Sequence, residues 1–479
     1  MIAADFRAQH FAASRQPHTC QLVEYLIENP NSGSYGIDFI RCLHRRFGAR
    51  AVCCYTSKEQ QPLSAKDCPE LFNPELVSAH YLVSTQAFPA FIHHLKAHHA
   101  IRAVIPHTEL RVESAITFAD ALGLDWVQPE IMRRFRNKAA LKAHLRQADP
   151  GLRINHTQLV HSPEDAWAAV RDNRLTRFVL KPNNGFGNVN IGIFSADDPA
   201  TMVADYWRRT QAESLLLEEF IAGEEYHCNG QVDAAGNIII IDIGRTHYAE
   251  TAQREIVCLR TDQVPQSHPV FASIADYTSR MIRASGLRRS PFHAELRVDE
   301  NGPSLLECAA RIIGADWARF TQIMHGPSFN MVDLAAHYYM TAAPYGLSGI
   351  NWENYNAQVL FKVRGVSAQP AKIRQLEGVA AVESLPQFLD WTERPSIGQH
   401  LTSTNSLMSS AYALMLRCQT WAEADGIERQ VRALLRWNTR SLSLPESLAY
   451  GCGRMKSNLQ WRINQRRRRS THFFNQVFA

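Results

Sequence analysis

The chain lacks the features that mark membrane-spanning, secreted or zinc-finger proteins. No run approaches about 18 apolar residues, and the first 18 residues hold no apolar core of a secretory signal, so we expect neither a membrane span nor a leader. The ten cysteines form no CxxC pair and no zinc-site spacing. Their scatter predicts free thiols in a reducing, cytoplasmic setting.

Acidic residues are missing from the end of the chain. Residues 447–479 carry a charge of +7 and no acid, from Arg454, Lys456, Arg462 and the run Arg466 to Arg469. Because the whole chain has a net charge of +5, the rest carries about −2 by subtraction. The body is therefore not a basic nucleic-acid binder. The basic tail, residues 446–479, could touch a nucleic acid or an anionic membrane, and the alternative is a solvated terminal helix.

Length and composition indicate a globular chain of several domains, with 479 residues of which 45% are hydrophobic. Residues 20–56 predict a strand, a glycine-bearing turn, an amphipathic helix and a second strand, which is the start of a parallel sheet. A strand at 101–107 and a helix after it complete an α/β domain, residues 18–128. Its turn, NSGSYG, is not a GxGxxG fingerprint and is weak support for a dinucleotide.

The remaining chain predicts two α+β domains. We expect helices at 131–148 and 161–173, then strands in pairs with helices between them, giving a mainly antiparallel domain over residues 129–345. Strands at 357–365, 381–388 and 410–418, with a helix at 427–439, predict a small α+β domain over residues 350–445.

The most informative stretch is FHAELRVDENGPSLLECAARIIG, residues 292–314. Two strand-like runs joined by DENG predict a hairpin, on which Glu295 and Glu307 can point to one face. Two facing carboxylates repel unless a cation lies between them, and Mg²⁺ prefers such oxygen ligands. Arg311 would then neutralise negative charge beyond the metal. The alternative is a surface hairpin with two solvated glutamates.

Three further pieces precede this hairpin in a fixed order. Lys138 starts a helix in RRFRNKAALKAHL, and Lys181 ends a strand in VLKPNNGFGN. The acidic stretch LEEFIAGEE, which contains Glu218 and Glu225, comes next. The four pieces together resemble the ATP-grasp superfamily, closely over residues 100–345 and loosely in the flanks. The resemblance implies a Rossmann-like pre-ATP-grasp domain, a two-lobed ATP-grasp core and a small C-terminal α+β domain.

The resemblance also implies roles in nucleotide binding. Lys138 and Lys181 would meet the ATP phosphates under a loop with Gly185 and Gly187, because glycine lets backbone amides approach closely. Around the adenine and ribose, the residues implied are Glu218, Phe220, Ile221 and Glu225. The alternatives are surface lysines, a plain hairpin turn and an exposed acidic turn.

Two positions depart from the family pattern. Asn188 stands where the family usually has serine or threonine, which puts a side-chain contact to phosphate in doubt. Ala309 stands where an asparagine is common after the second metal glutamate. The resemblance therefore implies that Mg²⁺, with Mn²⁺ as a second candidate, is held by Glu295, Glu307, phosphates and water.

Within the superfamily, the chain looks most like the L-amino acid ligases and related carboxylate–amine ligases. The matching segments are AVIPHTELRVESAITFADALGL, MRRFRNKAALKAHLRQ and, loosely, the part after residue 356. This resemblance implies that a carboxylate takes the γ-phosphate of ATP and that an amine then attacks the acyl phosphate. Arg311 would bind the carboxylate or the oxyanion. The substrate-side candidates are Glu109, His247 and His293, any of which could accept the proton of the amine, and Trp317, which would limit the size of the pocket. The alternatives are structural histidines and a packing tryptophan.

Two other functions remain open at this point. One is an ATP-binding protein that acts through its basic tail on a membrane, a nucleic acid or a carrier. The other is a ligase that joins a carboxylate other than an amino acid to an amine. The intact set of Glu295, Glu307 and Arg311 argues against a pure binding module. The resemblance also implies a homodimer that acts on small-molecule substrates.

Overall fold

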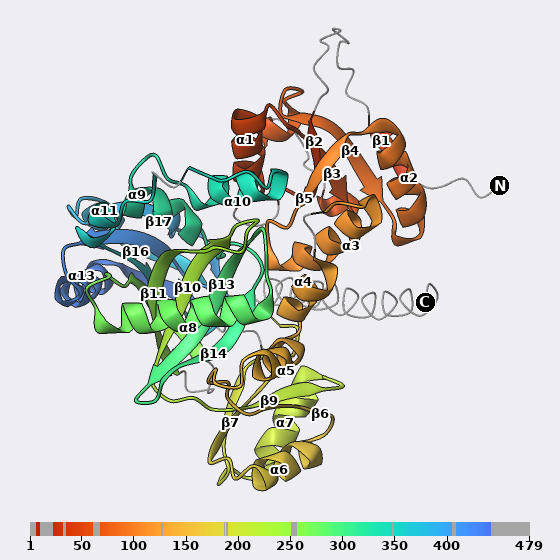
Figure 1. The fold of residues 1–479 in the computed structure, drawn as a ribbon. Coiled ribbons are helices and arrows are strands. Elements are labelled where there is room, and N and C mark those ends of the chain that lie inside the picture. Colours follow the sequence, from red (N-terminus) through yellow and green to blue (C-terminus); the bar gives the residue numbers. More distant parts are fainter. Residues whose placement is uncertain are drawn as a thin grey trace.

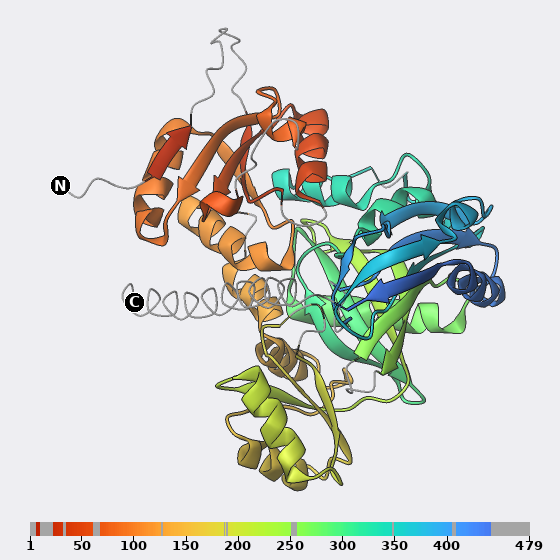
Figure 2. The ribbon, with the colours of Figure 1, turned by 180° about the vertical axis from the view of Figure 1, so that it is seen from behind.

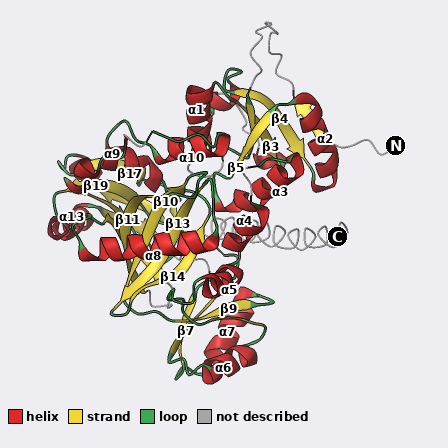
Figure 3. Cartoon of the chain, viewed as in Figure 1, coloured by secondary structure: helices red, strands yellow, loops and turns green. Residues whose placement is uncertain are grey.

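The computed structural model describes residues 6–9, 23–31, 35–60, 68–125, 128–185, 187, 190–250, 256–346, 349–404 and 409–441. An N-terminal layer and a small lobe lie at opposite ends of a large central sheet (Figure 1). Helices and strands are mixed throughout (Figure 3). Asn188 and the basic tail lie outside the described residues.

The N-terminal part is an α/β layer. Its five-stranded sheet has the order β1-β4-β3-β2-β5, and β2 pairs in parallel with both β3 and β5. The strands are β1 (Phe6–Gln9), β2 (Glu24–Glu28), β3 (Arg50–Tyr55), β4 (Val77–Val83) and β5 (Ile101–Ile105). The helices are α1 (Gly36–Phe47), α2 (Phe88–His98) and α3 (Val112–Leu122). The parallel start expected from residues 20–56 is thus present.

The helix expected over residues 131–148 is two helices, α4 (Pro129–Arg136) and α5 (Lys138–Ala148). Asn137 separates them because its backbone is extended and its side chain caps α5 by accepting a hydrogen bond from the Ala140 amide. Asparagine at this position satisfies one of the free amides of the helix start. The break places Lys138 at the N-terminus of α5, where it faces the rest of the site.

The small lobe has a four-stranded antiparallel sheet in the order β6-β9-β7-β8. The strands are β6 (Thr157–Val160), β7 (Arg177–Lys181), β8 (Gly192–Ser195) and β9 (Leu215–Glu219), and the helices are α6 (Pro163–Asp172) and α7 (Ala200–Thr210). Ser162 caps α6 through the Asp165 amide, as the sequence predicts.

The central sheet has eight antiparallel strands in the order β14-β13-β10-β11-β12-β15-β19-β17. They are β10 (Glu224–Val232), β11 (Ile238–Glu250), β12 (Ile256–Gln263), β13 (Ser290–Asp299), β14 (Gly302–Ala309), β15 (Val359–Arg364), β17 (Phe388–Glu393) and β19 (Ala413–Cys418). Helix α8 (Pro269–Ser285) runs across the sheet, and α9 (Thr321–His325), α10 (Met331–Met340) and α11 (Trp352–Asn356) connect it to the N-terminal layer and β15 (Figure 1).

The C-terminal part, expected as a small α+β domain over 350–445, is joined to this sheet. β15 pairs with β12, so the last strands extend the central sheet, as the view from behind shows (Figure 2). A small sheet of β16 (Ala371–Glu377), β18 (His400–Leu401) and β20 (Arg436–Arg440) adjoins them, with α12 (Val379–Glu383) and α13 (Trp421–Leu434). The strand expected at 381–388 is mostly wrong, because Gly378 in the left-handed region starts α12 there.

Two expectations from composition can be compared with the structure. The cysteines within the described ranges are free thiols. A search of the same residues found no helix with the length and apolarity needed to cross a bilayer.

Candidate active site

Two carboxylates face each other on the β13–β14 hairpin. Glu295 and Glu307 are direct partners in the antiparallel register, so both side chains leave the sheet on the same face. About a quarter of each side chain is exposed, 26% for Glu295 and 27% for Glu307. The hairpin and the facing carboxylates are as the sequence predicts.

Lys138 connects the helical region to this hairpin. Its ammonium lies 2.8 Å from Glu307 Oε2 and donates to the Gly185 carbonyl at 2.8 Å. Desolvation raises the pKa of Glu307, but Lys138 and Lys181 outweigh it and hold that pKa below its ordinary value. Lys138, the glycine loop and Glu307 therefore meet at one point.

Glu218 is buried between two lysines. Lys142 Nζ lies 2.7 Å from Glu218 Oε1, and Lys181 Nζ lies 2.8 Å from Glu218 Oε2. Burial raises the pKa of Glu218, but the two ammonium groups outweigh it and bring the pKa to about 2. If Glu218 accepts a hydrogen bond from the adenine amino group, as expected, it would do so with the carboxylate lone pairs that the two lysines do not occupy. Lys142 was missed by the sequence analysis, although it lies one helical turn after Lys138 and so on the same face.

Arg311 is held by Glu109. Its Nε donates to Glu109 Oε2 at 2.6 Å, and Arg136 pairs with the other carboxylate oxygen. Burial raises the pKa of Glu109, and Arg311 and Arg136 then lower it to about 2. Such a weak base is a poor acceptor for the proton of an amine, the role expected for it. Its geometry instead orients the Arg311 guanidinium.

The residues expected to bind the nucleotide also include Gly187, Phe220 and Ile221. Gly187 has φ of +67°, a conformation that favours glycine. The Phe220 ring lies under the guanidinium of Arg177 at 3.9 Å, and Arg297 donates to the Ile221 carbonyl at 3.1 Å.

Glu225 lies on β10 and forms an ion pair with Arg297 of β13. Burial and the nearby Glu295 raise the pKa of Glu225 to about 7, against the opposing effect of Arg297.

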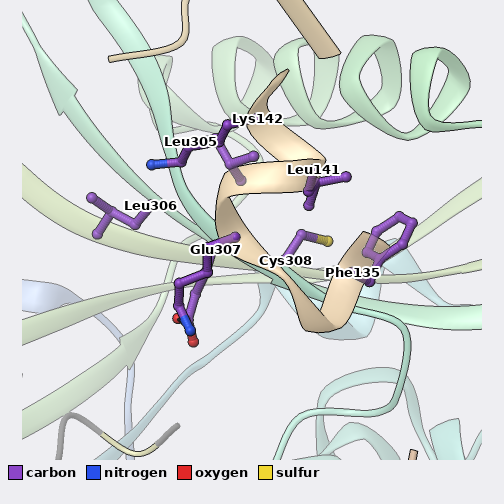
Figure 4. A pocket seen from close by; sticks show the side chains of 8 residues that line it. Phe135, Leu141, Lys142, Leu305, Leu306, Glu307 and Cys308 are labelled. Carbon is purple, nitrogen blue, oxygen red and sulfur yellow. Dashed lines mark ion pairs between the residues drawn. The ribbon is translucent and has the colours of Figure 1, made fainter. Parts of the chain in front are cut away.

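A narrow hollow lies between helices α4 and α5 and strand β14. Side chains from both sides line it, namely Phe135, Lys138, Leu141, Lys142, Leu305, Leu306, Glu307 and Cys308 (Figure 4). The side chains nearly fill it, leaving about 180 Å³ of empty space between them and the open solvent.

The two candidate histidines lie on opposite faces of the sheet. His293 lies on the same face as Glu295. Its Nε2 is 3.2 Å from Glu295 Oε1, and its Nδ1 is 2.8 Å from Asn229 Oδ1. Burial and Arg311 lower the pKa of His293 well below its ordinary value.

His247 lies on the far face. On β10, His227 pairs with Glu295 of β13 and with Gly244 of β11, so Gly244 lies on the face of the carboxylates. His247 follows Gly244 by three residues, an odd number, and therefore points to the other face. Its ring contacts Asp262 Oδ2 at 2.6 Å. His247 therefore does not reach the carboxylates, because residues an odd number apart on a regular strand point to opposite sides.

Trp317 points inward and is 2% exposed. Its indole nitrogen donates to Asp242 Oδ1 at 2.9 Å, and Asn229 Nδ2 donates to the same oxygen at 2.9 Å. Asp242 and Asn229 were missed by the sequence analysis. The available signal was an aspartate within the apolar run IIIIDIG, since a buried charge there needs partners.

The facing carboxylates fit a divalent cation with oxygen ligands. Desolvation and the neighbouring Glu307 raise the pKa of Glu295 to about 7, and a cation between the two carboxylates would oppose both effects. No group of three or more His, Cys, Asp or Glu within the described ranges is arranged to hold a metal. Phosphate oxygens and water would have to complete the shell around Glu295 and Glu307, as is usual for Mg²⁺.

Known proteins resemble parts of this chain in sequence. The ATP-grasp domain family matches residues 176–319. Dapdiamide A synthase of Enterobacter agglomerans is 26% identical over 228 residues, which cover 45% of this chain and 52% of that protein. The chain thus matches about half the length of this curated relative.

Solved structures show the fold over most of the chain. An L-amino acid ligase from Bacillus licheniformis has a TM-score of 0.67 at 17% identity, covering 88% of this chain and 99% of that one. A phosphoribosylglycinamide synthetase from Anaerococcus prevotii has a TM-score of 0.59 at 10% identity, covering 88% and 100%. With the family match over residues 176–319, the ATP-grasp fold expected from the sequence is confirmed.

Proposed function

We propose that the protein is an ATP-dependent carboxylate–amine ligase. It joins an amino acid or another small carboxylic acid to an amine or a second amino acid, and it releases ADP and phosphate. The observation that carries this function is the pair of facing carboxylates, Glu295 and Glu307, with Lys138 on one side and the Arg311–Glu109 pair nearby. A protein that only bound ATP would need no arginine beyond the metal carboxylates.

The reaction has two steps that balance without a covalent enzyme intermediate. An oxygen of the substrate carboxylate attacks the γ-phosphorus, and the bond to ADP breaks. The amine nitrogen then attacks the acyl carbon, the carbon–oxygen bond to phosphate breaks, and the amine loses a proton. Mg²⁺ or Mn²⁺ held by Glu295 and Glu307 would neutralise phosphate charge.

Positive side chains would receive the charged groups of the substrates. Lys138 and Lys181 would bind phosphate oxygens, each exchanging part of its present ion pair for the nucleotide. Arg311, oriented by Glu109, would bind the carboxylate and then the oxyanion. His293 would hold Glu295 in place as a hydrogen-bonding partner.

The amine would enter beside the residues that follow Arg311. We call residues 313–320 the acceptor segment. Trp317 lies in it with the indole buried against Asp242, on the carboxylate face of the sheet. A large buried ring at this place would limit the size of the amine. Trp317 would therefore help to determine which amines the enzyme accepts.

A substrate panel tests the function. Phosphate release from Mg-ATP would be measured with amino acids and small carboxylic acids, singly and in pairs, and the nucleotide product would be identified. We expect ADP and phosphate only with particular pairs, and loss of turnover in Glu307→Ala. Glu300→Ala, an exposed glutamate on the same hairpin, is the matched control and should keep activity. AMP as the product, or turnover that survives Glu307→Ala, would overturn it.

A further inference from the structure

The acceptor segment contacts three separate parts of the fold. From the N-terminal layer, the Tyr35 hydroxyl accepts a hydrogen bond from the Ala318 amide at 3.0 Å and donates to the Gly314 carbonyl at 3.5 Å. From the central sheet, Asp242 accepts from the Trp317 indole. From the C-terminal strands, Lys362 donates to the Ala315 carbonyl at 2.8 Å.

The backbone at the centre of this segment is in an unfavourable conformation. Ala315 and Asp316 have φ of +56° and +63°, in the left-handed region. For residues other than glycine this costs on the order of 1 kcal/mol each, and it persists only where surrounding contacts hold it. The hydrogen bonds of Tyr35 and Lys362 bracket these two residues and supply such contacts.

Lys362 lies on the face of the sheet that carries the catalytic residues. It pairs with Thr261, which pairs with Thr246, which pairs with Glu225, so their side chains share one face. The lysine is 2% exposed. Desolvation and Arg364 lower the pKa of Lys362 to about 7. Burying a lysine is costly, so its hydrogen bond to the Ala315 carbonyl indicates a use for it there.

Tyr35 and Lys362 come from the two ends of the chain, on either side of the central catalytic part. Tyr35 is 1% exposed and precedes α1, and Lys362 lies on β15. Both donate to or accept from the backbone of the acceptor segment, and neither contact involves the carboxylates of β13 and β14. The N-terminal and C-terminal parts of the fold therefore contact the acceptor segment, next to which the amine is proposed to bind.

We propose that Tyr35 and Lys362 are positioning residues that hold the acceptor segment in its left-handed conformation, so that amine binding, but not carboxylate activation, depends on the N-terminal and C-terminal parts of the fold. Because this deepens the proposed function, the test separates the two half-reactions. Hydroxylamine is small enough to capture an acyl phosphate without a formed amine subsite, whereas an amino acid requires that subsite.

The variants are Tyr35→Phe and Lys362→Met, which remove one hydrogen-bonding group each and keep most of the side-chain volume. For both, hydroxamate formation from hydroxylamine and product formation from each standard amino acid would be measured. We expect the KM for the amino acid to rise about fivefold to tenfold, the worth of one hydrogen bond, with the KM for ATP and the hydroxamate rate within about twofold of the parent.

Two matched controls separate positioning from general stability. Tyr25→Phe removes a buried hydroxyl that has no hydrogen-bond partner within the described part of the chain, and Lys96→Met removes an exposed ammonium on α2. Both should keep the parent KM values. Thermal unfolding of every variant shows whether the fold is intact.

Three results would overturn the inference. The first is an unchanged KM for the amino acid in both variants. The second is an equal loss of hydroxamate and amino-acid product. The third is a loss in proportion to a lowered unfolding temperature, as for a packing role. Absence of hydroxamate in the parent protein with every carboxylate would instead remove the proposed function itself, and with it this inference.

Discussion

At the scale of single residues, Glu218 shows how strongly the site depends on paired charges. Its side chain is 2% exposed and that of Lys142 is 1% exposed. Lys142→Met leaves a buried carboxylate with Lys181 alone, and we expect the free energy of unfolding to fall by about 3 kcal/mol, as when one partner of a buried pair is removed. Urea unfolding measures this.

The double variant Lys142→Met with Glu218→Gln is the control, because it removes the uncompensated charge as well. It should recover part of the loss, giving a clear coupling between the two positions. Additive losses would contradict the pairing.

The same carboxylate gives a pH dependence with a definite sign. The pKa of Glu218 is about 2 in the fold against an ordinary 4.5, so its stabilising effect is present above pH 4.5 and is lost as the pH falls through 2. In Glu218→Gln, the free energy of unfolding should fall less steeply over this interval, by up to about 1.4 kcal/mol per pH unit. Chemical unfolding at several pH values checks it, and identical slopes would contradict it.

Individual residues also show what sequence could and could not predict. The DENG turn and the spacing of the two glutamates predict the facing pair, since hairpin register is a local property. The pairing of Glu109 with Arg136 and Arg311 joins segments far apart in the chain, and no local pattern contains it. The expectation for His247 fails because its position on β11, an odd number of residues after Gly244, directs its side chain to the face of the sheet opposite Glu295.

At the scale of elements, the break between α4 and α5 positions Lys138, the first of the two lysines proposed to bind phosphate. Asn137 Oδ1 accepts from the Ala140 amide and from Asn183 Nδ2, so it joins the helix start to the glycine loop. Asn137→Ala should lower stability by about 1 kcal/mol, the worth of a cap, and also raise the KM for ATP.

Ser162→Ala is the matched control for Asn137→Ala. It removes the cap of α6, which lies in the small lobe, and should lower stability similarly with the KM for ATP unchanged. An equal effect of both caps on the KM would contradict a role for the α4–α5 break. The sequence predicted helical residues here but not the break, because a lone asparagine in an amphipathic pattern is also compatible with a continuous helix.

At the scale of the whole molecule, the central sheet joins parts that the sequence separates. The pattern of strands after residue 356 predicts a small α+β domain but not its attachment, in which β15 pairs with β12 and Arg260 pairs with Glu428 of α13. Pairing between distant strands is a non-local property that no window of sequence contains.

Two truncations test this continuity. A chain that ends at residue 345 would expose the edge of β12 and should be insoluble or unfolded. A chain that lacks residues 446–479 should fold and keep full ligase turnover. A soluble, active 1–345 fragment would contradict the continuity, and loss of turnover without the basic tail would favour the function through that tail.

The central claim is that a carboxylate oxygen attacks the γ-phosphorus, and oxygen labelling tests it most directly. The carboxylate substrate would be labelled with ¹⁸O in both oxygens, and the phosphate released during ligation would be analysed by mass spectrometry. The acyl-phosphate mechanism predicts one ¹⁸O atom in each phosphate, since the bridging oxygen leaves with phosphorus. Unlabelled phosphate, or ¹⁸O in AMP, would contradict it.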